Sequence, residues 1–211
     1  KQLVSLKEVA IDMPAGPSEV EVIADESANP AFIAADFLSQ AEHGVDSQAM
    51  LVTASESIVK PVMQAIREQL DRLPRKEITE KSLSHSRLIV LKDKQEVIDF
   101  TNLYAPEHLI IQTTDYADIA GQVENAGSVF MGPYTPGSAG DYASGTNHTL
   151  PTNGYAKAYS GVNLDSFIKK ITFQEITADG IRLLGGTIRT MAANEQLDAH
   201  KNAVTIRLNT L

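Results

Sequence analysis

Short runs of β-branched and apolar residues alternate along the chain with longer stretches in which apolar residues recur every three or four positions. The short runs are typical of strands, and the longer stretches are typical of amphipathic helices. This alternation predicts a layered domain of the α/β class. The expected strands are residues 19–24, 49–53, 87–91, 108–112 and 128–131.

The clearest helical signal begins at Asn29, a residue type favoured at N-caps, with Pro30 at the first helical position. We expect this helix to end at Gly44, because glycine is the preferred residue beyond a helix end. Its apolar stripe has helical spacing and consists of Ile33, Phe37 and Ala41.

Further helices are expected over residues 56–70 and 95–104. Because proline restricts the residue before it, Pro106 predicts an extended Ala105 and the end of the second of these helices. After residue 164 the pattern is helical again, with 187–200 as the most plausible long helix.

Residues 132–161 interrupt the alternation, because they are rich in glycine and have almost no periodic core pattern. A long ordered loop in a compact domain is usually functional. Tyr134, Tyr142 and His148 are poor residues for a disordered segment, so we expect an ordered site here. The resulting division is an inter-domain lead-in (1–18), an α/β domain with most of the site (19–161) and a small helical C-terminal arm (162–211).

With 43% hydrophobic and 21% charged residues, the chain has an ordinary globular composition. Its formal net charge of −9 argues against nucleic acid as a partner, because the phosphates would be repelled. No apolar stretch approaches the roughly 18 residues of a membrane span, and no signal peptide is recognisable. We therefore expect a cytoplasmic protein that binds neither nucleic acid nor membrane.

The chain has no cysteine, so any bound metal must be held by histidine, carboxylate or amide oxygen. It also lacks the G-x-G-x-x-G and P-loop signatures of phosphate binding. We therefore expect an incomplete Rossmann-like layered sheet, followed by a small C-terminal helical unit. Lys1 is not an initiator methionine, and residues 13–18 read as a connection between domains, so we expect a fragment of a longer protein.

Gln40 and His43 are three residues apart and are therefore neighbours on one helix face. Gln40 also falls on the buried stripe, where an unpaired amide costs about 1–3 kcal/mol. The spacing alone favours a hydrogen-bonded core glutamine and a histidine attracted by the helix dipole, with a ligand site as the alternative.

Glu107 and His108 stand at the start of an expected strand, directly after Pro106. A carboxylate beside an imidazole can supply a general base and activate water. Adjacent side chains on a strand point to opposite faces, so a shared pocket requires a twist or an edge position. As an isolated dipeptide, Glu107-His108 is more simply an exposed charged pair.

The remaining candidates lie later in the chain. Asp141 and His148 belong to the glycine-rich loop, where backbone can approach a ligand closely. Glu195 and His200 would point about 140° apart on one straight helix, so their joint use requires a helix break or two separate contacts. The donors of a cysteine-free zinc or manganese site are available in Gln40, His43, Asp141 and His200.

These residues lie in longer runs, and through them the whole chain resembles the histidinol dehydrogenases. The runs read PAGPSE from Pro14, LSQAEHG from Leu38, APEHL from Ala105, SAGDYASGTNH from Ser138 and AHKNAV from Ala199. Five separate blocks in the family's order make the resemblance highly specific.

The resemblance implies a role for each candidate. One Zn²⁺ per site would be held by Gln40, His43, Asp141 and His200. Glu107 would activate water and His108 would accept protons. The substrate would contact the four ligands together with Ser18, His108, His148 and Glu195. The family oxidises histidinol to histidine through the aldehyde with two NAD, and the zinc mainly orients the substrate.

The resemblance also concerns what lies outside the chain. Family members are about twice as long, and most of the NAD site lies in an N-terminal half that is missing here, so we expect the chain alone to be inactive. In the family the C-terminal arm reaches across a dimer. We therefore expect a homodimer with exchanged arms, in which His200 and Glu195 complete the partner's site.

One topological conflict remains in this prediction. Gln40, His43 and the Glu107-His108 pair lie where helices lead into strands, whereas Asp141 follows a strand. In a purely parallel sheet these are opposite edges, and ligands normally gather at the carboxyl ends. Either one strand is antiparallel or the glycine-rich loop sweeps back.

Two other function classes fit the same residues. A metal-dependent hydrolase is possible because zinc beside a Glu-His pair also suits attack by water, and it would have no place for a nicotinamide. A non-catalytic module that binds a protein through its acidic helical surface would require the motif residues to be dispersed in space.

Overall fold

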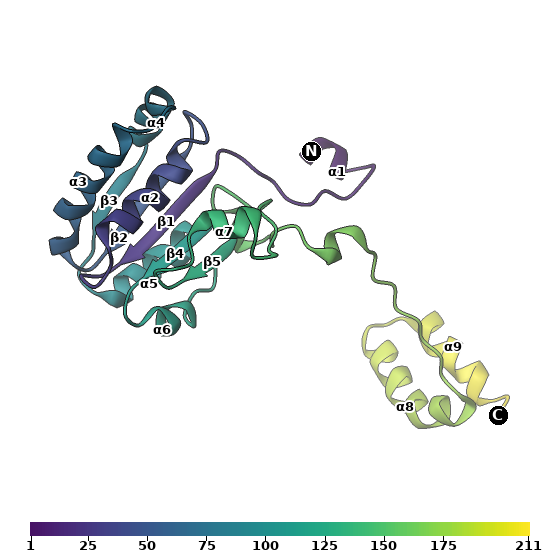
Figure 1. Ribbon diagram of the computed structural model, residues 1–211. Coiled ribbons are helices and arrows are strands. Elements are labelled where there is room, and N and C mark those ends of the chain that lie inside the picture. Colours follow the sequence, from purple (N-terminus) through teal and green to yellow (C-terminus); the bar gives the residue numbers. More distant parts are fainter. The chain divides into compact units, whose positions relative to one another are not determined.

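Five short apolar segments form one fully parallel sheet in the order β3-β2-β1-β4-β5 (Figure 1). The strands are β1 (Glu19–Ala24), β2 (Gln48–Thr53), β3 (Arg87–Val90), β4 (His108–Gln112) and β5 (Ser128–Met131). Each agrees with its predicted run to within one residue. The structure is a computed structural model, and it describes residues 1–211 apart from the side chain of Gln2.

Helices cover both faces of this sheet. On one face lie α2 (Pro30–Ala41), α3 (Val59–Leu70), which follows the short 3₁₀ turn η1 (Glu56–Ile58), and α4 (Lys76–Leu83). On the other lie α5 (Lys94–Tyr104) and α6 (Tyr116–Ala120). The α/β class and the incomplete Rossmann-like layering predicted from the sequence are confirmed.

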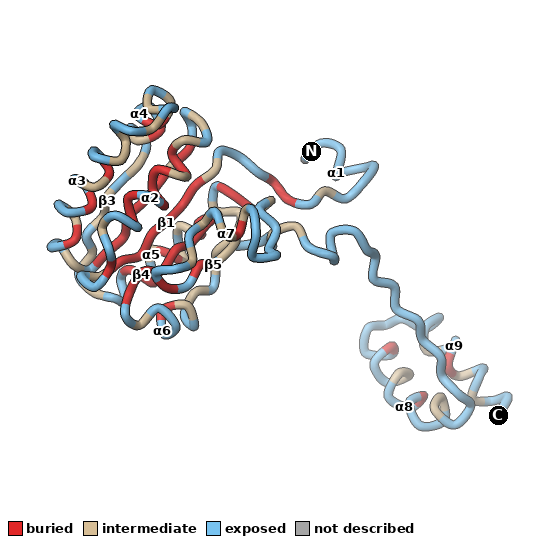
Figure 2. The backbone as a smooth tube through the Cα atoms, in the orientation of Figure 1, coloured by how far each residue is buried: buried red, intermediate tan, exposed pale blue. Residues whose placement is uncertain are grey.

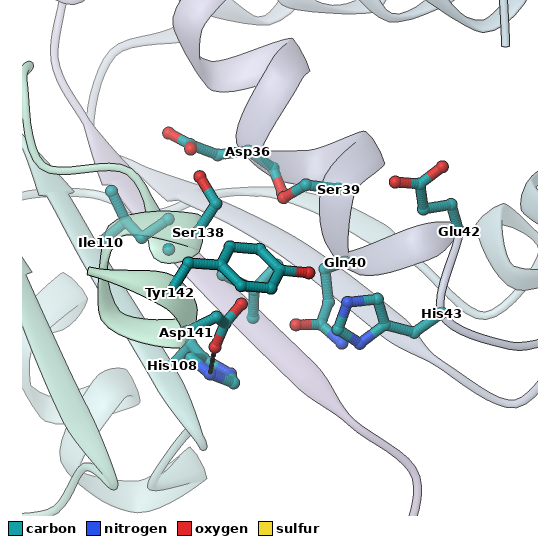
Figure 3. A pocket seen from close by; sticks show the side chains of 12 residues that line it. Asp36, Ser39, Gln40, Glu42, His43, His108, Ile110, Ser138, Asp141 and Tyr142 are labelled. Atoms are coloured by element: carbon teal, nitrogen blue, oxygen red, sulfur yellow. Dashed lines mark hydrogen bonds and ion pairs between the residues drawn. The ribbon is translucent and has the colours of Figure 1, made fainter. Parts of the chain in front are cut away.

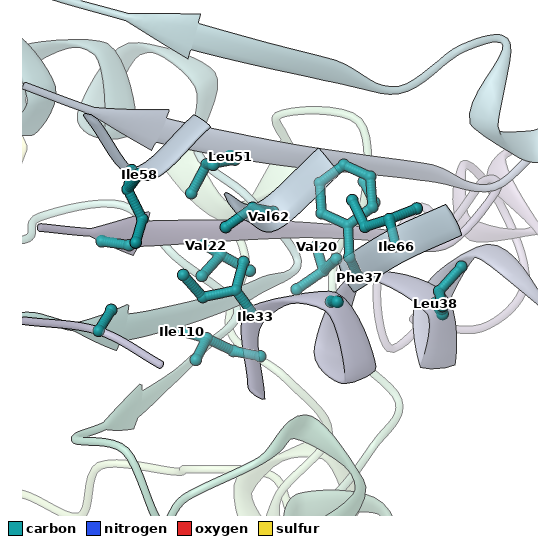
Figure 4. Close-up of a cluster of buried hydrophobic side chains, with 14 of the residues drawn as sticks. Val20, Val22, Ile33, Phe37, Leu38, Leu51, Ile58, Val62, Ile66 and Ile110 are labelled. Atoms are coloured by element: carbon teal, nitrogen blue, oxygen red, sulfur yellow. The ribbon is translucent and has the colours of Figure 1, made fainter. Parts of the chain in front are cut away.

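The alternation of side chains along β1 builds a core on each face. Val20 and Val22 pack against α2 and α3 (Figure 4). Ile23 packs on the opposite face, towards α5 and α6. All residues of β1 are buried, as the continuous red stretch in Figure 2 shows. Burial on both faces explains why four of the six residues of this central strand are apolar; the exceptions are Glu19 and Glu21.

The start of α2 follows the prediction, but its end does not. The Asn29 side chain accepts a hydrogen bond from the backbone N–H of Ala31 at 2.9 Å, with Pro30 at the first helical position. The helix already ends at Ala41, and Glu42 caps it in a right-handed conformation. The expected Gly44 cap is wrong, because Gly44 instead belongs to the turn in which its carbonyl accepts from the N–H of Ser47.

The prediction for Ala105 is also wrong. Ala105 adopts the left-handed conformation, with φ 57° and ψ 65°, at the end of α5. Pro106 disfavours the right-handed region for the residue before it, but an extended Ala105 is not the only remaining choice. The left-handed geometry lets the N–H of Ala105 close the helix on the carbonyl of Thr101 at 2.7 Å.

The chain divides into two compact units, Lys1–Ile168 and Lys169–Leu211. The first also contains α1 (Gln2–Ser5), α7 (Gly137–Tyr142) and the 3₁₀ turns η2 (Tyr155–Lys157) and η3 (Leu164–Phe167). The predicted limits at residues 18 and 161 remain a prediction. No helix among the described residues combines the length and the apolarity needed to cross a membrane.

The second unit is a pair of helices, α8 (Ala178–Asn194) and α9 (Asp198–Leu208), so the single helix expected over 187–200 is wrong. The break lies at Gln196, whose φ is 60°. The N–H of Leu197 reaches the carbonyl of Ala192 at 2.9 Å, the bond that defines a Schellman end. A Cβ on Gly185 would lie 2.8 Å from Leu208, so glycine permits the close approach of the two helices.

A buried carboxyl in the middle of β1 makes the stability of the first unit dependent on pH. Glu21 is fully buried; one oxygen accepts from the Thr101 hydroxyl, and the other has no hydrogen-bond partner among the described residues. Burial raises the pKa of Glu21 to about 8, against the lowering effect of Thr101, and nearby Glu19 adds to the rise.

We predict that Glu21→Gln removes a loss of stability that the natural chain suffers between pH 4.5 and about 8. A carboxyl whose pKa is raised by folding binds its proton more tightly in the folded state, so stability falls as pH rises through this window. The free energy of unfolding that the natural chain loses over this pH range is several kcal/mol at most, since one pKa unit is worth about 1.4 kcal/mol. Denaturant titrations of both proteins at pH about 5 and about 8 measure it, and an identical pH dependence in the two would contradict the prediction.

Candidate active site

Most of the predicted site residues of the first unit gather at one edge of the sheet. A pocket of about 100 Å³ lies between α2 and α7, beside the first residue of β4 (Figure 3). Four predicted residues line it: Gln40, His43, His108 and Asp141. They come from three separate segments, and the dispersal that a non-catalytic module requires is not observed for them.

The pocket lies at the amino-terminal edge of a sheet whose strands are all parallel. His108 begins β4 and pairs with Val20 near the start of β1. Asp141 follows the carboxyl end of β5, but the chain turns back after this strand and brings α7 against α2. A Cβ on Gly140 would lie 2.7 Å from the Phe130 ring, so glycine allows α7 to lie directly on the sheet. The sweeping loop, and not an antiparallel strand, resolves the topological conflict.

The last turn of α2 supplies the first side of the pocket. The side chain of Gln40 is buried, and its Nε2 has no hydrogen-bond partner among the described residues. In Figure 3 its amide lies between the ring of His43 and the carboxylate of Asp141. The oxygen and nitrogen of an amide can be exchanged without changing its shape, so this position can equally present an acceptor. A buried amide without a partner fits a ligand bound in the pocket.

The donors in this pocket fit part of a zinc site. Within the described residues, no three His, Asp or Glu side chains form a group that could hold a metal by themselves. The pocket offers an imidazole from His43, a carboxylate from Asp141 and an amide from Gln40. This is three-quarters of the predicted set, and its nitrogen and oxygen donors are types that zinc accepts.

The surroundings of His108 define the roles of its two ring nitrogens. Nδ1 lies 3.2 Å from the backbone carbonyl of Glu19 and 3.5 Å from Oε2 of Glu107, both of which are acceptors. Nδ1 therefore carries the proton in the neutral ring. Nε2, which faces the pocket and lies 3.9 Å from Oδ1 of Asp141, keeps a lone pair. This tautomer suits a proton acceptor.

The pKa of His108 reflects a balance of burial and charge. Burial by itself lowers it, because an imidazolium is costly away from water. The hydrogen bond and negative charge of Glu107 raise it, with smaller contributions from the carbonyl of Glu19 and the charge of Asp141. The net direction is upward, which strengthens His108 as a base.

Glu107 supports the pocket from behind and is not among the residues that line it. It is buried directly before β4, and its Oε2 accepts the backbone N–H of Glu19 at 2.9 Å. Because Glu107 stands just outside the strand, its carboxylate can approach the ring of His108. The two side chains contact each other, but only His108 lines the pocket, so the shared role of the pair stays a prediction.

Two further predicted residues of the first unit lie elsewhere. Ser18 lines a neighbouring open cavity of about 430 Å³ that shares His43 with the main pocket. His148 is exposed and is not among the residues that line the main pocket of this chain. The loop turns outward near Gly145, whose φ is 91°. Whether His148 contacts substrate stays a prediction.

Glu195 and His200 belong to the second unit. Glu195 caps the end of α8, and His200 lies in the first turn of α9, so the helix break required for their joint use lies between them. Their roles remain predictions.

Sequence reasoning missed several residues that line the main pocket: Asp36, Ser39, Glu42, Ser138 and Tyr142. Asp36 carried a usable signal, because it lies one helical turn before Gln40 and seven residues before His43, on the same face. Ser138 and Tyr142 are neighbours of Asp141 in α7, a helix that the glycine-rich sequence did not predict.

Several known proteins similar to this chain are named histidinol dehydrogenase. The histidinol dehydrogenase family model matches residues 1–208. A histidinol dehydrogenase of Bacteroides thetaiotaomicron is 69% identical over 211 residues, which are 100% of this chain and 49% of that protein. The chloroplastic histidinol dehydrogenase of Arabidopsis thaliana is 58% identical over 204 residues, 96% of this chain and 44% of that protein.

The fold leads to the same relatives. The crystal structure of histidinol dehydrogenase from Elizabethkingia anophelis matches with a TM-score of 0.96 at 57% identity, covering 100% of this chain and 48% of that one. The chain thus spans about half the length of the curated relatives it matches. These relatives favour a dehydrogenase over the metal-dependent hydrolase. The chain belongs to the histidinol dehydrogenase family.

Proposed function

We propose that the full-length protein containing this chain oxidises histidinol to histidine through the aldehyde, with two NAD as hydride acceptors. The observation that carries this proposal is the meeting of Gln40, His43, His108 and Asp141 in one pocket of a chain that belongs to the family.

His108 takes the proton in the first oxidation. NAD, when bound, would take the hydride of the alcohol, and Nε2 of His108 is placed to take the hydroxyl proton, which leaves the aldehyde. The positive charge gained by the ring is stabilised by Glu107 and by the carbonyl of Glu19. The hydrogen bond to Glu19 keeps the ring oriented towards the pocket.

Glu107 acts in the second oxidation. Water adds to the aldehyde carbon, and the resemblance to the family assigns its proton to the carboxylate of Glu107, which lies behind the pocket. Once His108 has released its first proton to solvent, its Nε2 would take a proton from the hydrate while a second NAD takes the hydride, which leaves the carboxylate of histidine. Oε2 of Glu107 lies 3.5 Å from Nδ1 of His108, so a proton taken up by one of these side chains can pass to the other.

Zinc, when bound, supplies a positive charge that orients the nitrogen atoms of the substrate. Gln40, His43 and Asp141 would hold it on one side, and His200 would be the fourth ligand. Ser18, Glu195 and His148 would contact the substrate around this centre. NAD would bind mainly to the part of the full-length protein that this chain does not include.

We further propose a homodimer in which each C-terminal arm completes the partner's site. Phe173 and Leu183 of the second unit are 92% and 83% exposed, and side chains of this size favour contact with another surface. The cytoplasmic location remains a prediction, as does the lack of nucleic-acid or membrane partners.

The decisive experiment uses the purified full-length protein with histidinol and NAD. We expect two NADH and one histidine for each histidinol consumed. Chelation should abolish the activity, and added zinc should restore it. No NADH from the zinc-loaded protein, or a stoichiometry of one with the aldehyde as final product, would contradict the proposal.

A further inference from the structure

Asp36 is a buried carboxylate that touches three parts of the fold around the pocket. It lies in α2, lines the pocket and is only 6% exposed. Its Oδ2 accepts a hydrogen bond from Nε2 of Gln112 at 2.8 Å, and the carboxylate also interacts with the backbone N–H of Gly137. Gln112 ends β4 and Gly137 begins α7, so one side chain connects α2, β4 and α7.

The helix that Asp36 contacts needs such a tie. α7 has only six residues and no side-chain hydrogen bond at its N-cap, Pro136. An isolated helix of this length is not stable in water. Both the turn before it and the residues after it are largely exposed. The contacts that hold it include the packing of Gly140 on Phe130, the approach of Asp141 to His108 and the interaction of Gly137 with Asp36.

The residue that α7 delivers to the pocket is Asp141. It lies four residues after Gly137, one helical turn further along the same face. A shift of Gly137 away from α2 would therefore carry the carboxylate of Asp141 away from Gln40 and His43.

We propose that Asp36 is a positioning residue: it holds α7 against α2 and so places Asp141 opposite Gln40 and His43. The consequence for metal binding rests on the proposed function of Asp141 as a zinc ligand, whereas the effect on α7 does not. Burial raises the pKa of Asp36 to about 6. At neutral pH the ionised form therefore predominates, and it accepts from both Gln112 and the backbone of Gly137.

The test uses the full-length protein and two measurements, hydrogen–deuterium exchange of residues 137–142 without metal and zinc affinity by chelator competition. Asp36→Ala should speed the exchange of this segment at least tenfold. It should also weaken zinc binding about 10–100-fold, as found for residues that orient metal ligands. Thr53→Ala is the matched control, since Thr53 is also buried, but its hydroxyl donates to the carbonyl of Ala24 in β1 and not to α2 or α7. Thr53→Ala should change neither the exchange of residues 137–142 nor the affinity for zinc.

A paired substitution covers the case in which Asp36→Ala does not fold. Gln112→Glu would set two carboxylates against each other and should loosen α7. Adding Asp36→Asn gives the pair a donor and an acceptor again, and the amide oxygen of the new residue can still accept from Gly137. Exchange protection of 137–142 should then return, and its failure to return would overturn the proposal.

Asp141→Ala separates this proposal from the proposed function. If it leaves zinc affinity unchanged, the assignment of Asp141 as a ligand is wrong, and the exchange measurement still judges Asp36. If Asp141→Ala weakens zinc binding while Asp36→Ala changes neither exchange nor affinity, Asp36 does not position α7.

Discussion

Replacing His108 with asparagine in the full-length protein should lower kcat about 10²–10⁴-fold, the usual range for a general base, with little change in KM for histidinol. Asparagine can still donate to the carbonyl of Glu19, which His108 contacts at 3.2 Å, so the pocket should keep its shape. It cannot accept a proton at neutral pH, so the step that generates the aldehyde would lose its base.

Steady-state kinetics with saturating NAD measure this effect, and His85→Asn provides the matched control. His85 is exposed, and its hydrogen bonds are made by its backbone to Ser82 and Gln48, so the change should be nearly silent. A tenfold rise in KM with unchanged kcat for His108→Asn would show that His108 binds substrate without accepting its proton.

The central strands could be predicted because burial on both faces leaves runs of β-branched and apolar residues. The run from Val20 to Ala24 has to fill a core above and below the sheet, so a single composition rule finds it. The start of α2 was equally accessible, because Asn29 and Pro30 act locally. Local chemistry of this kind is contained in a few neighbouring residues.

The ends of helices were less predictable, because several conformations close a helix and tertiary contacts choose among them. Ala105 could leave α5 as an extended or a left-handed residue, and the bond to Thr101 selects the second. Gln196 occupies a left-handed position that usually takes glycine, so the break between α8 and α9 carries no glycine signal.

The site was only partly accessible from sequence for a related reason. The spacing of Gln40 and His43 shows a shared helix face, but nothing in it shows that Asp141 returns to that face from the far end of β5. Only the resemblance to a family joined these residues in advance. The helical spacing places Asp36 on the same face as Gln40 and His43, but its contact with the backbone of Gly137 could not be read from any side-chain pattern.

Mixing two inactive full-length variants, Gln40→Ala and His200→Ala, should restore about one quarter of the natural activity if the arm works across a dimer. Random exchange makes half of the dimers mixed, and each mixed dimer has one intact site of two. The intact site combines Gln40 from one chain with His200 from the other, while both substitutions fall on the second site.

The physical ground for this expectation is the small core of the second unit. Within α8 and α9 only Gly185, Ala192 and Val204 are buried, which is too little apolar surface to stabilise two helices alone. The arm must therefore pack on a larger body, and a second copy of the chain offers one at the same concentration.

The measurement is NADH formation after subunit exchange, with exchange itself verified by two different affinity tags. If the tags prove that mixed dimers form and activity stays absent, His200 completes the site of its own chain, because every site would then carry one of the two substitutions.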